Sequence, residues 1–190
     1  PTRIDKPGQF QDNPDLDDKL PPTSFRAGLS PSLVVSPTTG TLAFVYQNNV
    51  NRPQSEADIS IQLSTDGGAT WSDARFLSVT GTGQPADNDQ FFPWIDSDPA
   101  GNLVAIWYDR RRDPGNTLVD TWQAVSSDDG LTWRSRRITT QAWDSILFDF
   151  IGDYIGVAAG TAAIYPVWTD GRDLTFKGET DIFTNVEIRS

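Results

Sequence analysis

The chain has 190 residues, enough for one domain with a substantial core, and it contains no histidine, cysteine or methionine. The missing histidine and cysteine exclude the usual general base, a thiol nucleophile and the commonest zinc ligands. A net charge of −11 argues against nucleic acid or an anionic membrane surface as a partner. Ca²⁺ stays possible, because it needs only oxygen ligands, and no other cofactor is expected. No apolar run is long enough for a transmembrane helix. Since methionine is missing even at position 1, we expect a mature or excised segment.

The first thirty residues are expected to hold a short strand and an acidic leader. Thr2–Ile4 resembles the later β-rich segment Arg137–Thr139, so we expect it to form a strand. The carboxylates between Asp12 and Asp18 lack the D-x-D-x-D-G spacing of a calcium loop, which favours a solvated linker.

Three similar units follow, at residues 31–80, 91–140 and 151–190. In the first unit, Pro31–Pro37, Thr41–Tyr46 and the run after Asp58 read as short strands, and Arg75–Val79 reads as a fourth. The same order recurs after 61 or 62 residues, completely in the second unit and as far as the third strand in the third. No segment shows a sustained helical period. The chain is therefore predicted to be all-β, and tandem four-stranded antiparallel units indicate the blades of a β-propeller.

An octapeptide of the form S-x-D-x-G-x-T-W follows the third strand in the first two units. It stands at Ser64–Trp71 and again at Ser126–Trp133. In a tight turn, the aspartate can accept backbone N–H bonds and the glycine can take a positive φ, while the tryptophan packs on a neighbouring unit. We therefore assign a structural role to the shared residues, which are Ser64, Asp66, Gly68, Trp71, Ser126, Asp128, Gly130 and Trp133.

The third unit has no octapeptide, because its serine and aspartate positions fall at Glu187 and Arg189. Three blades cannot close on themselves without exposing large apolar faces. We predict that two copies of the chain form a six-bladed ring with two-fold symmetry, in which Thr2–Ile4 completes the third blade of the partner. The alternative is that these residues are half of a longer polypeptide.

The octapeptides resemble the Asp-box, or bacterial neuraminidase repeat, of the sialidase superfamily, and the resemblance covers most of the chain from about Pro31. Trp107–Arg111 and Trp168–Arg172 are similar to the W-x-D-x-R end of a blade strand in such proteins. Gly152–Gly156 is similar to their G-D-Y-x-G segment. The resemblance implies half of a six-bladed, sialidase-like propeller.

Sialidases of this family carry an arginine triad for the substrate carboxylate, a Tyr–Glu nucleophile pair and an aspartate acid/base. Their first arginine lies in an R-I-P motif. The nearest candidate here is Arg26, which lacks the following Ile-Pro, and no Tyr–Glu pair is readable. The catalytic set therefore does not transfer to this chain.

The longer connections are expected on the face opposite the octapeptide turns, and ligand chemistry concentrates on such loops. The three adjacent cations of Arg110–Arg112 could grip a carboxylate or sulfate of an acidic sugar. The repeated D-x-R sequences read as intra-blade ion pairs or, less readily, as a binding clamp. Asp153 and Tyr154 precede an inner strand and could line a pocket. The candidate ligand-binding residues are Arg26, Asp109, Arg110, Arg111, Arg112, Asp153, Tyr154, Asp170 and Arg172.

Two classes of function remain open. The first is a secreted module, extracellular or in the cell envelope, that holds a glycan or a protein on the loop-rich face. The second is a sialidase-type glycoside hydrolase acting on acidic sugars, through paired carboxylates or a tyrosine nucleophile. The missing R-I-P motif and the scarce glutamates favour binding for this chain alone, with no residue assigned as catalytic or as a metal ligand.

Overall fold

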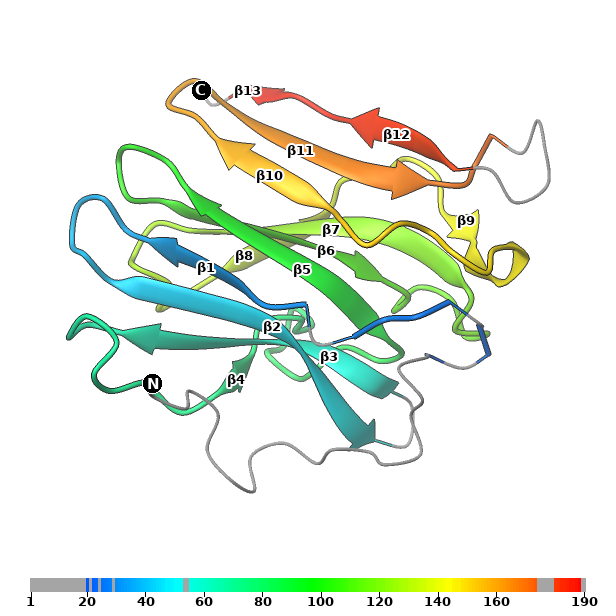
Figure 1. Cartoon of the computed structure of the whole chain (residues 1–190), viewed down its shortest axis with the longest axis horizontal. Coiled ribbons are helices and arrows are strands. Elements are labelled where there is room, and N and C mark those ends of the chain that lie inside the picture. Colours follow the sequence, from blue (N-terminus) through cyan, green and yellow to red (C-terminus); the bar gives the residue numbers. More distant parts are fainter. Residues whose placement is uncertain are drawn as a thin grey trace.

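The computed structural model describes residues 20, 22–23, 25–28, 30–52, 55–173 and 180–188. These residues form three antiparallel sheets that lie in layers (Figure 1). Blade 1 contains β1 (Ser32–Val35), β2 (Leu42–Arg52), β3 (Ser55–Ser64) and β4 (Arg75–Phe76), hydrogen-bonded in that order. The all-β class predicted from the sequence is confirmed. The segment Thr2–Ile4 and the acidic leader lie outside the described residues.

Blade 2 repeats this order, and the described residues of blade 3 repeat it as far as the third strand. Blade 2 contains β5 (Gln90–Ser97), β6 (Leu103–Asp109), β7 (Leu118–Ser126) and β8 (Arg134–Arg137). Its β7 also pairs with β9 (Trp143–Asp144), which precedes the short 3₁₀ helix η1 (Ser145–Leu147). Blade 3 contains β10 (Gly156–Ala159), β11 (Ala163–Asp170) and β12 (Asp181–Thr184), and β13 (Glu187–Ile188) pairs with the start of β11.

Two features of blade 2 differ from the sequence-based expectation. The elements β9 and η1 were not predicted, since a two-residue strand and a single turn carry no readable period. Asp144 starts η1 by accepting the backbone N–H of Ile146. The inner strand β5 starts before the expected Pro93, because a bulge with Phe92 at φ 51° carries the strand past the proline.

The apolar core lies between the blades and is divided by β6. All seven residues of β6 are buried, and alternate side chains enter different clusters. Leu103, Ala105 and Trp107 pack between blades 1 and 2. Val104, Ile106 and Tyr108 join a cluster that reaches blade 3. Full burial of a large apolar side chain contributes about 1.5–3 kcal/mol, so β6 links the three layers energetically.

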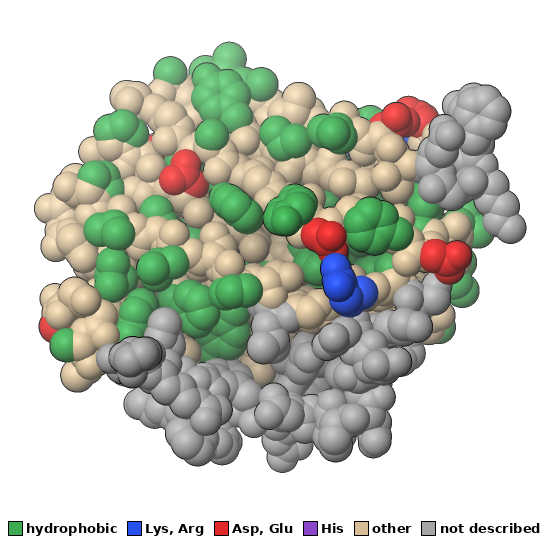
Figure 2. All heavy atoms as spheres, in the orientation of Figure 1, with side chains coloured by type: hydrophobic (Ala, Val, Ile, Leu, Met, Phe, Trp, Pro, Cys, Tyr) green, Lys and Arg blue, Asp and Glu red, His purple; other side chains and the backbone are tan. Residues whose placement is uncertain are grey.

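The far side of blade 3 is apolar and exposed. Ile182 and Ile188 are about 80% exposed, and Tyr165 and Val167 also face outward. Figure 2 shows hydrophobic side chains in several separate patches on the face that is seen in Figure 1. Within the described ranges, no helix is long and apolar enough to cross a membrane.

The layered blades separate two kinds of connection. The short turns from β1 to β2, from β5 to β6 and from β10 to β11 gather at the left in Figure 1. The connections from β6 to β7 and from β8 to β10 lie at the right, on what we call the loop-rich face.

Candidate functional site

The two octapeptides form turns whose polar groups bond to one another. In the second copy, Asp128 accepts the backbone N–H of Thr132 at 2.8 Å and its hydroxyl at 2.6 Å. The Ser126 hydroxyl accepts the N–H of Gly130 at 2.9 Å, and the indole of Trp133 donates to the Gly130 carbonyl, also at 2.9 Å. The first copy makes the same bonds.

The turn geometry also fixes the charge of both aspartates. The bonds from the threonine, with the hydroxyl bond the largest cause, lower the pKa of Asp66 and of Asp128 to about 2. Trp133 packs against the core between blades 1 and 2. These carboxylates thus serve their own turns, away from the loop-rich face.

The D-x-R sequences at the ends of β6 and β11 form buried ion pairs. Arg111 Nε donates to Asp109 at 2.9 Å, and Arg172 Nε donates to Asp170 at 3.0 Å. Each aspartate is also bonded by the indole of a tryptophan two residues earlier, at 2.8 and 3.2 Å. The guanidinium groups lie over aromatic rings of the same blades. The geometry is that of an intra-blade ion pair and not of a binding clamp.

Arg110 points into the protein, which corrects the expectation of a three-cation grip. Its side chain is fully buried, with the guanidinium carbon 5.3 Å from the Phe25 ring centre and 5.1 Å from that of Phe91. Burial lowers its pKa to about 10. Its nitrogens reach three oxygens, Asp89 Oδ2 at 3.3 Å, Thr23 Oγ1 at 3.0 Å and Ser145 Oγ at 2.9 Å.

Arg112 is the exposed member of the arginine run. Its side chain is 55% exposed, and Nη1 lies 3.4 Å from Asp120 Oδ2. Asp120 is also bonded by Arg137 and by the hydroxyl of Thr139. The run therefore separates into one core residue, one ion-pair partner and one surface residue.

Three other predicted residues meet on the loop-rich face. Arg26 Nη2 lies 2.9 Å from Asp153 Oδ1, with the two side chains 66% and 39% exposed. Tyr154, the next residue, is 80% exposed. These residues come from segments before blade 1 and before blade 3, so the fold, and not the local sequence, brings them together.

A cleft of about 310 Å³ adjoins Tyr154. It opens where β5 and the start of β10 lie side by side, and its walls include Trp94, Tyr154, Ile155, Val167, Thr169 and Ile182. Sequence reasoning missed Trp94, whose side chain is partly exposed. A signal was present, because Trp94 follows Pro93 where the first unit has Ser32 after Pro31.

This arrangement offers both polar and flat apolar surfaces to a ligand. Arg26 supplies a planar set of donors and Asp153 supplies acceptors, while Tyr154 and Trp94 supply ring faces. An exposed ion pair is worth only about 0–1 kcal/mol of stability, so a ligand can rearrange it at little cost. Among the described residues, no group of three or more acidic, histidine or cysteine side chains is placed to hold a metal ion.

The sequence matches no family model and no curated protein. Solved structures are similar in fold. An alpha-L-arabinanase of Penicillium chrysogenum in complex with arabinobiose shares 20% identity at a TM-score of 0.62, over 84% of this chain and 46% of that one. An alpha-L-arabinofuranosidase of Fusarium graminearum with arabinobiose shares 17% identity at a TM-score of 0.63, over 88% and 48%.

A Hadza microbial sialidase shares 18% identity at a TM-score of 0.53, over 84% of this chain and 32% of that one. The chain thus spans less than half the length of these three proteins. At such identities the likeness shows the fold alone, which is that of a β-propeller with sialidase-like architecture.

Proposed function

We propose that this chain is half of a ring-shaped propeller whose loop-rich face binds a glycan outside the cell. The observation that carries the proposal is the exposed Arg26–Asp153 ion pair beside Tyr154 and the adjoining cleft. Long connections on a rigid scaffold are where binding residues concentrate.

The chemistry of the site suits a sugar. A sugar ring presents hydroxyl groups at its edge and C–H groups on its faces. Tyr154 and Trp94 can stack on such a face, while Arg26 and Asp153 can bond the hydroxyls. The cleft of about 310 Å³ is at the lower end of ligand pockets, which fits one sugar unit. Because Arg26 can also bond a carboxylate in a bidentate way, an acidic sugar is the preferred class.

The exposed face of blade 3 supports a larger assembly. Tyr165 and Ile188, which lie outside the cleft, are too apolar and too exposed for a stable outer surface, so we propose that further blades cover them. A second copy of this chain or the rest of a longer one would supply these blades, giving six in all. The mass of the 190-residue chain in solution tests this, because a dimer is expected if a second copy closes the ring.

Titration of the assembled protein with neutral and acidic oligosaccharides, including sialyllactose and arabinobiose, tests binding. We expect Arg26→Ala and Tyr154→Ala to weaken binding roughly tenfold or more, since arginine and tyrosine side chains that a bound ligand covers dominate affinity. The matched control is Arg112→Ala, which removes another exposed arginine and should bind as the parent protein does.

Two outcomes would contradict the proposal. Equal affinity of all three variants would place the ligand elsewhere. Turnover of a fluorogenic sialoside or arabinoside that is lost in Tyr154→Phe would establish hydrolysis instead. For hydrolysis, a second carboxylate would have to come from another part of the assembly, because none of the described residues lining the cleft is acidic.

A further inference from the structure

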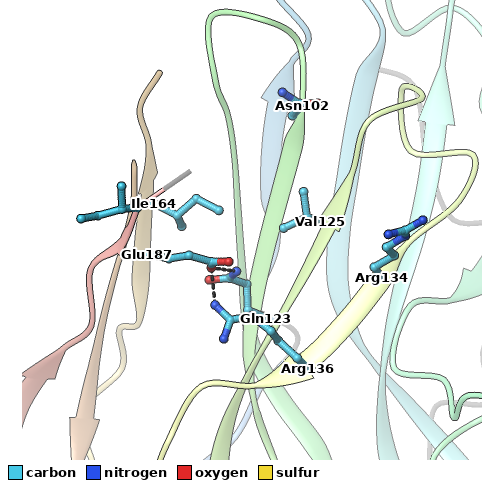
Figure 3. A pocket seen from close by; sticks show the side chains of 8 residues that line it. Asn102, Gln123, Val125, Arg134, Arg136, Ile164 and Glu187 are labelled. Carbon is cyan, nitrogen blue, oxygen red and sulfur yellow. Dashed lines mark hydrogen bonds and ion pairs between the residues drawn. The ribbon is translucent and has the colours of Figure 1, made fainter. Parts of the chain in front are cut away.

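A groove of about 600 Å³ lies between blades 2 and 3, away from the glycan site. Its walls include Asn102, Gln123, Val125, Arg136, Ile164 and Glu187 (Figure 3). The Glu187 carboxylate points toward blade 2, where it accepts the amide of Gln123 at 2.6 Å and pairs with Arg136. The equivalent boundary between blades 1 and 2 is filled by a turn, and it indicates what kind of ligand this groove would bind.

At that boundary, the turn Ser126–Trp133 of blade 2 packs against blade 1. Gly130 lies against Leu63 of blade 1 and Leu103 of β6, and a Cβ added to Gly130 would lie 3.0 Å from the first and 3.3 Å from the second. Arg75 of β4 reaches across and donates to the carbonyls of Gly130 and Leu131. An apolar floor and one arginine therefore hold the turn.

The strand register places equivalent residues around the groove. Arg75 is opposite Ile61 in blade 1, and Arg136 is opposite Gln123 at the same place in blade 2. In blade 2, Val125 takes the position that Leu63 has in blade 1. In blade 3, Ile164 takes the position that Leu103 has in blade 2, and the side chains of Val125 and Ile164 both line the groove.

Glu187 stands at the first position of an octapeptide turn. It is opposite Ile164 on β11, as Ser126 is opposite Leu103 on β6. Its carboxylate meets Arg136, whereas the equivalent Arg75 meets two backbone carbonyls. The arginine is therefore already charge-compensated, which argues against a small anion as the natural occupant.

We propose that this groove is a docking site for a polypeptide turn of the D-x-G-x-T-W kind, because Glu187 and Ile188 already stand at the first two positions of the octapeptide. Val125 and Ile164 would contact the glycine of the turn, and Arg136 would leave Glu187 to donate to two successive carbonyls. The proposal rests on the strand register and does not depend on the glycan site.

A fluorescently labelled peptide with the sequence of Asp128–Arg137, in linear and cyclised forms, tests this proposal by anisotropy with the 190-residue chain. We expect saturable binding that Arg136→Ala in the protein weakens about tenfold, because two hydrogen bonds from a charged donor are lost. A peptide carrying Gly130→Val should be weakened as much, since its side chain would meet the apolar floor. Arg112→Ala, outside the groove, should bind the peptide as the parent chain does.

Three results would overturn the proposal. One is the absence of saturable binding by both peptide forms to a chain whose circular dichroism shows it to be folded. Another is equal binding of the peptide that carries Gly130→Val. The third is saturable binding of sialic acid that depends on Arg136 and is not displaced by the peptide, which would make the groove an anion site.

Discussion

Replacement of Arg110 by methionine is the sharpest test of the corrected role of the arginine run. The variant keeps an unbranched side chain between the two phenylalanine rings but loses the ion pair with Asp89 and two hydroxyl contacts. Breaking a buried pair from one side costs about 3–5 kcal/mol. Asp89 keeps a bond from Asn116 at 2.6 Å, which favours the lower end, about 3 kcal/mol.

Urea denaturation followed by tryptophan fluorescence measures this loss. With a denaturant dependence of about 1–3 kcal/mol per molar, the midpoint should fall by about 1 M or more. Arg112→Met is the matched control, because its exposed contact with Asp120 is worth under about 1 kcal/mol. If Arg110→Met unfolds at the same urea concentration as the control, the buried ion pair does not stabilise the fold and the reasoning fails.

Three further predictions concern the turns and the packing of blade 3. Gly130→Ala should lose about 2–4 kcal/mol in chemical denaturation, because φ is +81° and the two facing leucines are 3.0 and 3.3 Å from the added Cβ. Gly67→Ala, at φ +70° with open space around it, should lose only about 1–2 kcal/mol, and equal losses would refute the packing argument. Gly171→Ala should cost about 1–3 kcal/mol, since its Cβ would lie 2.4 Å from the Phe148 ring, and an unchanged melting temperature would count against this contact. The pKa of Asp128 is lowered to about 2, so its stabilising effect is present above about pH 4 and is lost as the pH falls toward 2. Asp128→Asn should therefore show a shallower fall in melting temperature over this range, and an identical fall would contradict the assignment.

The fold was readable because it repeats. The strands and the two octapeptides recur at nearly the same spacing, which indicates that the two units pack in the same way. Ser64 and Ser126 therefore occupy equivalent places, opposite Leu42 and Leu103. The repeated D-x-R likewise favoured ion pairs, which Asp109 and Asp170 form.

The site was readable only in part, because its residues come together through tertiary structure. Arg26 and Asp153 were each identified from local sequence, but their contact joins distant segments. The direction of Arg110 was not visible either. Arg110 enters the core, whereas the equivalent residue of blade 3 is Gly171, whose lack of a side chain leaves room for the Phe148 ring. The neighbouring sequence gives no sign of either arrangement.

The double burial of β6 has a consequence for how the chain can unfold. Because its alternate side chains belong to both cores, opening blade 2 exposes apolar surface of blades 1 and 3 at once. Blade 3 contributes to one core only, so it can detach with the loss of that core alone. We therefore expect blade 3 to open first, as a separate and weaker foldon, and the middle blade to open last.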